Sequence, residues 1–135
     1  MSLLVRTRSR RTILIVEDAL TTRCILEQFF ARAGCDVLQA ADVETALRRL
    51  KTATVDAVIL DLRLANGQSG LEVLEQMRIE ERLADTPVVV LTGVSQVEPQ
   101  EEEIIRNNGA HLLYKRLGYR AVVDRLEEII AKAAA

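Results

Sequence analysis

Five polar side chains stand directly after short apolar segments of the chain. Glu17 and Asp18 follow residues 13–16, Asp61 follows 57–60, Thr92 follows 88–91, and Lys115 follows 112–114. Carboxylates brought within a few ångströms repel one another, so some would take up a proton unless a cation neutralised them. Oxygen ligands without histidine or cysteine favour a hard ion, Mg²⁺ before Zn²⁺. The lysine and the threonine would then bind a phosphoryl group, and an aspartate could attack its phosphorus to give an aspartyl phosphate.

Each of these residues has an ordinary structural explanation when it is taken alone. An acid after a strand is most often a helix cap or a solvated loop residue, and a lone threonine or lysine there is a loop hydroxyl or a surface charge. The combination is harder to explain in that way, because the charges are complementary and would lie along one edge of one sheet. The set therefore predicts a site for Mg²⁺ and a phosphoryl group.

The apolar segments that precede these residues are short, continuous and rich in β-branched side chains. Ile13-Leu14-Ile15-Val16, Ala57-Val58-Ile59-Leu60 and Val88-Val89-Val90-Leu91 are typical of strands buried on both faces, as in a parallel sheet. Val37-Leu38 and Leu112-Leu113-Tyr114 indicate two weaker strands. The chain therefore offers five strands for one sheet.

Helical patterns separate these strands. Apolar residues at helical spacing predict one helix that ends at Gly34, one behind an Asp42 cap, one that opens with a Ser69–Glu72 capping box, and one from Pro99 to Gly109. A fifth amphipathic helix carries Val122, Val123, Leu126, Ile129 and Ile130. Five β-α units in strict alternation predict an α/β fold, a three-layer α/β/α sandwich around a five-stranded parallel sheet. In such sheets ligands bind beyond the carboxyl ends of the strands, where the polar side chains would meet.

The composition fits one soluble globular domain. The chain has 135 residues, of which 49% are hydrophobic, 28% charged and 3% aromatic, and its net charge is -2. So few rings argue against a protein that stacks bases or sugars on aromatic faces. The opening residues lack the apolar length of a signal peptide, no apolar run approaches a membrane span, and two cysteines are too few for a disulfide framework. We therefore expect a cytoplasmic protein.

Residues 1–11 are predicted to form a basic N-terminal arm or a linker remnant, and residues 12–135 the folded domain. Arg6, Arg8, Arg10 and Arg11 give the arm its charge. Such an arm can touch phosphate backbones or acidic lipid, but it is more often a solvated tail. For the domain itself we expect no direct nucleic-acid binding and no membrane insertion.

Four motifs resemble those of the receiver domains of response regulators in two-component signalling. They are Ile13-Leu14-Ile15-Val16-Glu17-Asp18, Val58-Ile59-Leu60-Asp61-Leu62, Val90-Leu91-Thr92-Gly93 and Lys115, which occur in the family's order and at similar spacing. The resemblance covers about residues 12–132 and implies a flavodoxin-like sheet with strand order 2-1-3-4-5. It also implies that Asp61 is the phosphoacceptor, which takes a phosphoryl group from a histidine kinase or a phosphotransfer protein.

The resemblance assigns roles to the neighbours of Asp61 as well. Glu17, Asp18, the Asp61 carboxylate and the backbone carbonyl of Arg63 would bind Mg²⁺, and Thr92 and Lys115 would bind the phosphoryl group. Phosphorylation would then change the surface around the fourth helix, fifth strand and fifth helix. A downstream protein, a fused output domain or a second copy in a homodimer would read that surface. In this interpretation the chain is a signalling module and not an enzyme with a separate substrate.

The chain departs from the family at three places. Arg116 follows Lys115 where the family usually has proline. Leu112 stands where a switch tyrosine or phenylalanine is common, and Tyr114, two residues later, would point to the same face of the strand. Ala65 replaces a common proline in the loop after Asp61, which is one residue longer than usual. These changes concern signalling more than phosphorylation.

Two other function classes stay open on the sequence alone. A receiver-like interaction module that works without phosphate is favoured by Leu112 and by Lys115-Arg116. A small phosphohydrolase or a flavin protein on the same fold is a further alternative, but the chain lacks the common glycine-rich phosphate loops, and Asp61-Leu62-Arg63 lacks the second aspartate of an aspartate-based phosphatase. His111, the only histidine, is expected to be a packing residue.

Overall fold

The computed structural model describes residues 10–93 and 97–134. Along the chain lie β1 (Thr12–Val16), α1 (Leu20–Arg32), β2 (Asp36–Ala40), α2 (Val43–Thr52), β3 (Ala57–Asp61), α3 (Leu71–Ile79), β4 (Val88–Thr92), α4 (Pro99–Asn107), β5 (His111–Tyr114) and α5 (Tyr119–Ala134). The strands form one parallel five-stranded sheet in the order β2-β1-β3-β4-β5. The predicted three-layer sandwich and its strand order are confirmed.

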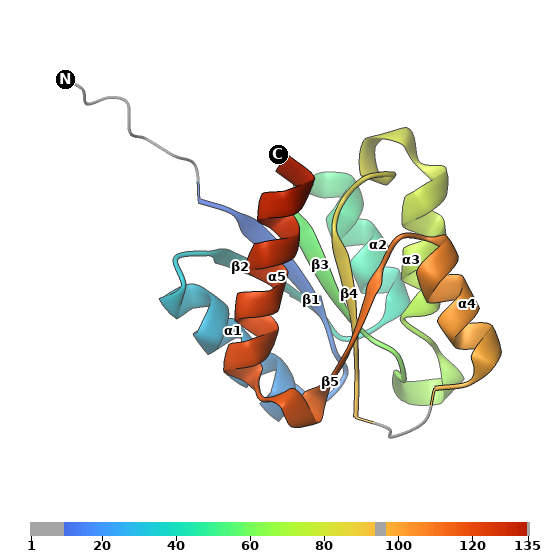
Figure 1. Cartoon of the computed structure of the whole chain (residues 1–135), viewed down its shortest axis with the longest axis horizontal. Helices are drawn as coiled ribbons and strands as arrows, with labels where there is room; N and C mark the ends of the chain where they lie inside the picture. Colours follow the sequence, from blue (N-terminus) through green and yellow to red (C-terminus); the bar gives the residue numbers. More distant parts are fainter. Residues whose placement is uncertain (1–9, 94–96, 135) are drawn as a thin grey trace.

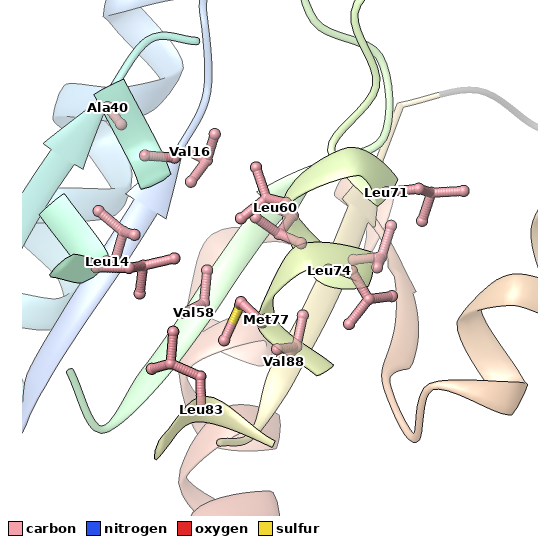
Figure 2. Packing of buried hydrophobic residues seen from close by; sticks show 14 of the residues in the cluster. Leu14, Val16, Ala40, Val58, Leu60, Leu71, Leu74, Met77, Leu83 and Val88 are labelled. Carbon is pink, nitrogen blue, oxygen red and sulfur yellow. The ribbon is translucent and has the colours of Figure 1, made fainter. Parts of the chain in front are cut away.

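Each face of the sheet packs against its own set of helices (Figure 1). On the face covered by α1 and α5, Ile13 and Ile15 of β1 are buried against Phe30. On the face covered by α2, α3 and α4, Leu14 of β1 lies in the same core as Leu74 of α3, as Figure 2 shows. Because both faces are covered, the central strands β1, β3 and β4 each carry four consecutive apolar residues and not apolar residues at alternate positions only.

The helix ends follow the turn chemistry that the sequence predicts. Gly34, at φ +90°, follows α1 in a conformation that favours glycine. Oδ1 of Asp42 accepts a hydrogen bond from the Thr45 backbone N–H at 2.7 Å, at the start of α2. At the start of α3, Glu72 accepts from the Ser69 N–H at 3.0 Å. The caps of α2 and α3 lie in loops at the carboxyl edge of the sheet, and Gly34 lies at the opposite edge, before β2.

The predicted N-terminal arm lies outside the described residues except at Arg10 and Arg11. Arg10 Nε is 2.9 Å from Asp36 Oδ1, and the Arg11 carbonyl accepts from the Asp36 N–H at 2.8 Å. These two residues therefore contact the start of β2, and the boundary at residue 12 stays a prediction. No helix in residues 10–93 and 97–134 combines the length and the apolar character that crossing a membrane requires.

Candidate functional site

Four adjacent strands bring the predicted site residues to one edge of the sheet. Glu17 and Asp18 follow β1, Asp61 is the last residue of β3, Thr92 is the last residue of β4, and Lys115 follows β5. Because these strands are parallel and adjacent in the order β1-β3-β4-β5, their carboxyl ends lie side by side. The topology thus places at one edge all five residues that the sequence predicts there.

The Asp61 carboxylate is buried and held at both oxygens. Its residue is 6% exposed. Oδ2 accepts a hydrogen bond from Lys115 Nζ at 3.1 Å, and Oδ1 accepts one from the Arg63 backbone N–H at 3.2 Å. The two donors fix the orientation of the carboxylate at the carboxyl end of β3.

Glu17 shares the same lysine. Its Oε1 lies 2.9 Å from Lys115 Nζ, and its Oε2 accepts a hydrogen bond from the Ala19 backbone N–H at 3.1 Å. Asp18 is exposed, in contrast to Glu17. One oxygen from each of Glu17, Asp18 and Asp61 lies within 4.8 Å of the other two, so the three carboxylates converge.

The cluster holds more negative than positive charge. Burial raises the pKa of Glu17 above its ordinary value, and the neighbouring Asp61 acts in the same direction. Burial acts to lower the pKa of Lys115, but the contact with Glu17 and the charge of Asp61 outweigh it, so that this pKa is raised. The cluster therefore has three carboxylates and one ammonium, which pairs with Glu17 and Asp61, and a further cation would relieve the repulsion among the carboxylates.

The donor set fits a hard divalent cation. Oε1 of Glu17 is buried and, among the described residues, accepts no hydrogen bond, although it forms an ion pair with Lys115. This oxygen keeps a lone pair for a metal, and the cluster contains only carboxylate oxygens, which Mg²⁺ prefers over nitrogen or sulfur ligands. The residues present are therefore suited to Mg²⁺.

Thr92 and the residues around Lys115 complete this edge. Thr92 is fully buried and pairs in register with Tyr114. Leu112 packs with the core on the α2–α4 side of the sheet, and the guanidinium of Arg116 lies 4.7 Å from the Tyr114 ring centre. The Lys115–Arg116 peptide is trans. A switch role for Tyr114 stays a prediction.

Gly70 contacts the end of β3 more closely than the sequence indicated. A Cβ atom built on Gly70 would lie 2.2 Å from the Asp61 carbonyl oxygen and 3.1 Å from Leu60 Cβ. Only a glycine allows the start of α3 to pack on this backbone. The available signal was the glycine itself, placed between Ser69 and the first apolar residue of the helix.

Two arginine contacts near the site were not predicted. Arg63 forms a two-pronged ion pair with Glu101 of α4, with Nη2 at 3.0 Å from Oε1. Arg23 of α1 donates from Nη1 to the Glu17 carbonyl at 2.8 Å. The only sequence signal for Arg23 was a basic residue in the first turns of the helix that follows the acid pair.

Comparisons with known proteins agree with this geometry. Residues 13–127 match the family model of the response regulator receiver domain. The chain is 34% identical over 127 residues to the sensory/regulatory protein RpfC of Xanthomonas campestris pv. campestris (strain 8004), a match that covers 92% of this chain and 17% of that protein. It is 33% identical over 83 residues to the alkaline phosphatase synthesis transcriptional regulatory protein PhoP of Bacillus subtilis (strain 168), covering 62% of this chain and 33% of that protein. The chain thus corresponds to only part of each of these longer relatives.

Solved structures show the same fold. A CheY-like response regulator receiver domain protein from Methanospirillum hungatei JF-1 superposes with a TM-score of 0.84 at 20% identity, covering 93% of this chain and 98% of that chain. The chemotaxis protein CheY4 of Vibrio cholerae superposes with a TM-score of 0.80 at 24% identity, covering 89% of this chain and 98% of that chain. Together with the family match over residues 13–127, the fold and the acidic edge show that this chain belongs to the response regulator receiver domain family of two-component signalling.

Proposed function

We propose that this receiver domain accepts a phosphoryl group on Asp61, with the help of Mg²⁺, and thereby switches a partner surface. The observation that carries the proposal is the position of Lys115 Nζ, 3.1 Å from Asp61 Oδ2 and 2.9 Å from Glu17 Oε1. This one ammonium joins the candidate acceptor to the candidate metal-binding acid. The same edge also holds Asp18 and Thr92, which supply a further carboxylate and a hydroxyl.

In the proposed transfer, the donor is a phosphohistidine of a histidine kinase or a phosphotransfer protein. One carboxylate oxygen of Asp61 forms a bond to phosphorus while the bond from phosphorus to the imidazole nitrogen breaks. The electron pair of the broken bond stays on that nitrogen, and a proton on the other ring nitrogen makes the imidazole a neutral leaving group. The phosphoryl group therefore moves with no change of oxidation state.

The neighbouring residues bind and orient the phosphoryl group. Lys115 pairs with its oxygens, and the Thr92 hydroxyl donates a hydrogen bond to one of them. Mg²⁺, held by Glu17, Asp18, Asp61 and the carbonyl of Arg63, would neutralise part of the charge on those oxygens. We infer that the domain acts as a switch for a downstream protein or a fused output domain and not as an enzyme. The surface of α4, β5 and α5 would then contact that partner or a second copy.

The test is the intact mass of the protein after incubation with acetyl phosphate and Mg²⁺. We expect one added phosphoryl group, which is absent from Asp61→Asn and from a sample with excess chelator. Asp85→Asn is the matched control, because it has the same change in mass and removes an exposed carboxylate that is not part of the cluster. An adduct of equal yield on Asp61→Asn would overturn the assignment of the acceptor.

A sample without any adduct requires a second measurement, because an aspartyl phosphate can hydrolyse quickly. Beryllofluoride, a stable phosphoryl mimic, should bind to the unmodified protein in the presence of Mg²⁺ and not to Asp61→Asn. Failure of both measurements would leave a phosphate-independent interaction module as the function of this domain.

A further inference from the structure

Arg23 of α1 contacts the main chain of the turn that carries Glu17 and Asp18. Nη1 of Arg23 donates a hydrogen bond to the Glu17 carbonyl at 2.8 Å and lies 3.5 Å from the Asp18 carbonyl. The backbone N–H of Arg23 bonds to the Ala19 carbonyl at 3.0 Å. Arg23 therefore contacts both acids through their main-chain carbonyls and not through their carboxylates.

Gln39 of β2 orients the Arg23 side chain. Its Oε1 accepts from Arg23 Nε at 2.8 Å, and its Nε2 donates to Glu27 Oε1 at 2.7 Å. A side-chain amide has one acceptor atom and one donor atom, so these two partners together define which way it points. These hydrogen bonds form a continuous network from Glu27 through Gln39 and Arg23 to the main chain of the acid pair. All of them are part-buried except the long contact to Asp18.

We propose that Arg23, oriented by Gln39, is a positioning residue for Mg²⁺ at the acidic cluster, an inference that rests on the proposed metal site. The Asp18 side chain makes no hydrogen bond or ion pair with the described residues, and the main chain that leads to it is held at the Glu17 carbonyl by Arg23. Outer contacts of this kind set the orientation of metal ligands, and their loss typically weakens metal binding about 10- to 100-fold.

Positioning and simple electrostatics predict opposite results. If Arg23 acted only as a nearby positive charge, it would repel Mg²⁺, and its removal would tighten binding. If it holds the acid pair in place, its removal weakens binding although a repelling charge has gone. Replacement of Gln39 by methionine further distinguishes the positioning role from the electrostatic one, because it leaves the charge of Arg23 unchanged and removes the residue that orients it.

The experiment measures the Mg²⁺ dissociation constant of the full chain by calorimetry. For Arg23→Gln we expect binding weakened about 10-fold or more, and for Gln39→Met a smaller loss in the same direction. Arg32→Gln is the matched control, because Arg32 is an exposed arginine of the same helix with no hydrogen bond to the described residues. Its Mg²⁺ affinity should be unchanged. In metal-free samples, the Ala19 amide, which donates to Glu17 Oε2, should exchange faster in both site variants than in the control.

Unchanged or tighter Mg²⁺ binding by Arg23→Gln and Gln39→Met would overturn the positioning role. A lower free energy of unfolding with unaltered Mg²⁺ affinity would assign Arg23 to the fold alone and overturn it as well. If Arg23→Gln does not fold, Gln39→Met decides the question by itself. Absence of Mg²⁺ binding by the unmodified protein would instead overturn the proposed metal site, and this inference with it.

Discussion

Lys115 is the single residue on which the charge balance of the site depends. Its replacement by methionine leaves the buried carboxylates of Glu17 and Asp61 facing one another without an ammonium. We expect the free energy of unfolding to fall by about 1–3 kcal/mol, and Mg²⁺ to restore part of the loss because it binds only the folded cluster. Urea denaturation with and without Mg²⁺ measures both effects. Lys51→Met, at an exposed position of α2, is the control, and an equal loss in the two variants would contradict the role given to Lys115.

Gly70 allows α3 to pack closely on the backbone of Asp61, because it has no Cβ atom. The alanine Cβ of Gly70→Ala would overlap the Asp61 carbonyl at 2.2 Å, so α3 or the end of β3 has to move. We expect a loss of about 1–3 kcal/mol in the free energy of unfolding, together with weaker Mg²⁺ binding. Gly93→Ala is the comparison, because among the described residues its added Cβ would meet Lys115 Cδ at an ordinary 3.5 Å. If calorimetry and urea denaturation gave the two variants the same small loss, the close approach at Gly70 would not matter.

At the scale of whole elements, one ion pair connects the end of β3 to the start of α4. The backbone N–H of Arg63 bonds to Asp61, and its guanidinium bonds to Glu101, which also accepts from the Glu98 N–H in the cap of α4. The pKa of Glu101 is lowered by its hydrogen bonds with Arg63, as expected for a carboxylate held by a guanidinium. The contact is therefore a link between the loop after Asp61 and α4.

A double-mutant cycle measures the strength of this link. Arg63→Gln and Glu101→Gln should each lower the free energy of unfolding, and the coupling between them should be about 0.5–1 kcal/mol, because the Arg63 side chain is half exposed. The coupling should decrease as salt is added. Hydrogen exchange in the first turn of α4 should also rise in both single variants. Glu103→Gln, an exposed acid on the same helix, should show no coupling with Arg63→Gln, and a coupling of zero for Glu101 as well would contradict the link.

The elements themselves were predictable, and their side-chain contacts were less so. β1, β3 and β4 could be predicted because a strand buried on both faces has a continuous run of apolar residues. The polar residues at the ends of these runs must then meet at one edge of the parallel sheet. The Arg63–Glu101 pair joins residues far apart in the chain, and the Arg23–Gln39 contact joins a helix to the outer strand. Such pairs depend on where loops place long, flexible side chains, which periodicity does not reveal. Gly70 was assigned only to a helix cap, because its contact with Asp61 requires the packed position of α3.

On the scale of the whole molecule, the two ends of the sheet carry different charge environments. The carboxyl edge gathers the acidic cluster, whereas His111 starts β5 at the opposite edge. Around His111 a cavity of about 310 Å³ is lined by Arg78 of α3, by Arg125 and Lys132 of α5, and by a single acid, Asp85. Positive charge therefore predominates where the only histidine of the chain is half-buried.

This environment makes the stability of the fold depend on pH through His111. Burial lowers its pKa below the ordinary value of 6.5, and the charges of Arg125 and Lys132 act in the same direction. The unfolded chain then binds more protons just below pH 6.5, so acidification through this window lowers the free energy of unfolding, while above it His111 has no effect. Because the chain has one histidine, its imidazole signals can be followed by proton NMR without assignment. We expect the midpoint of their pH titration below 6.5, and a higher midpoint in Arg125→Gln. In urea denaturation, the free energy of unfolding of the unmodified protein should fall more than that of His111→Gln between about pH 7 and about pH 5.5. Equal losses in the two proteins, with a titration midpoint of 6.5 or above, would refute this account.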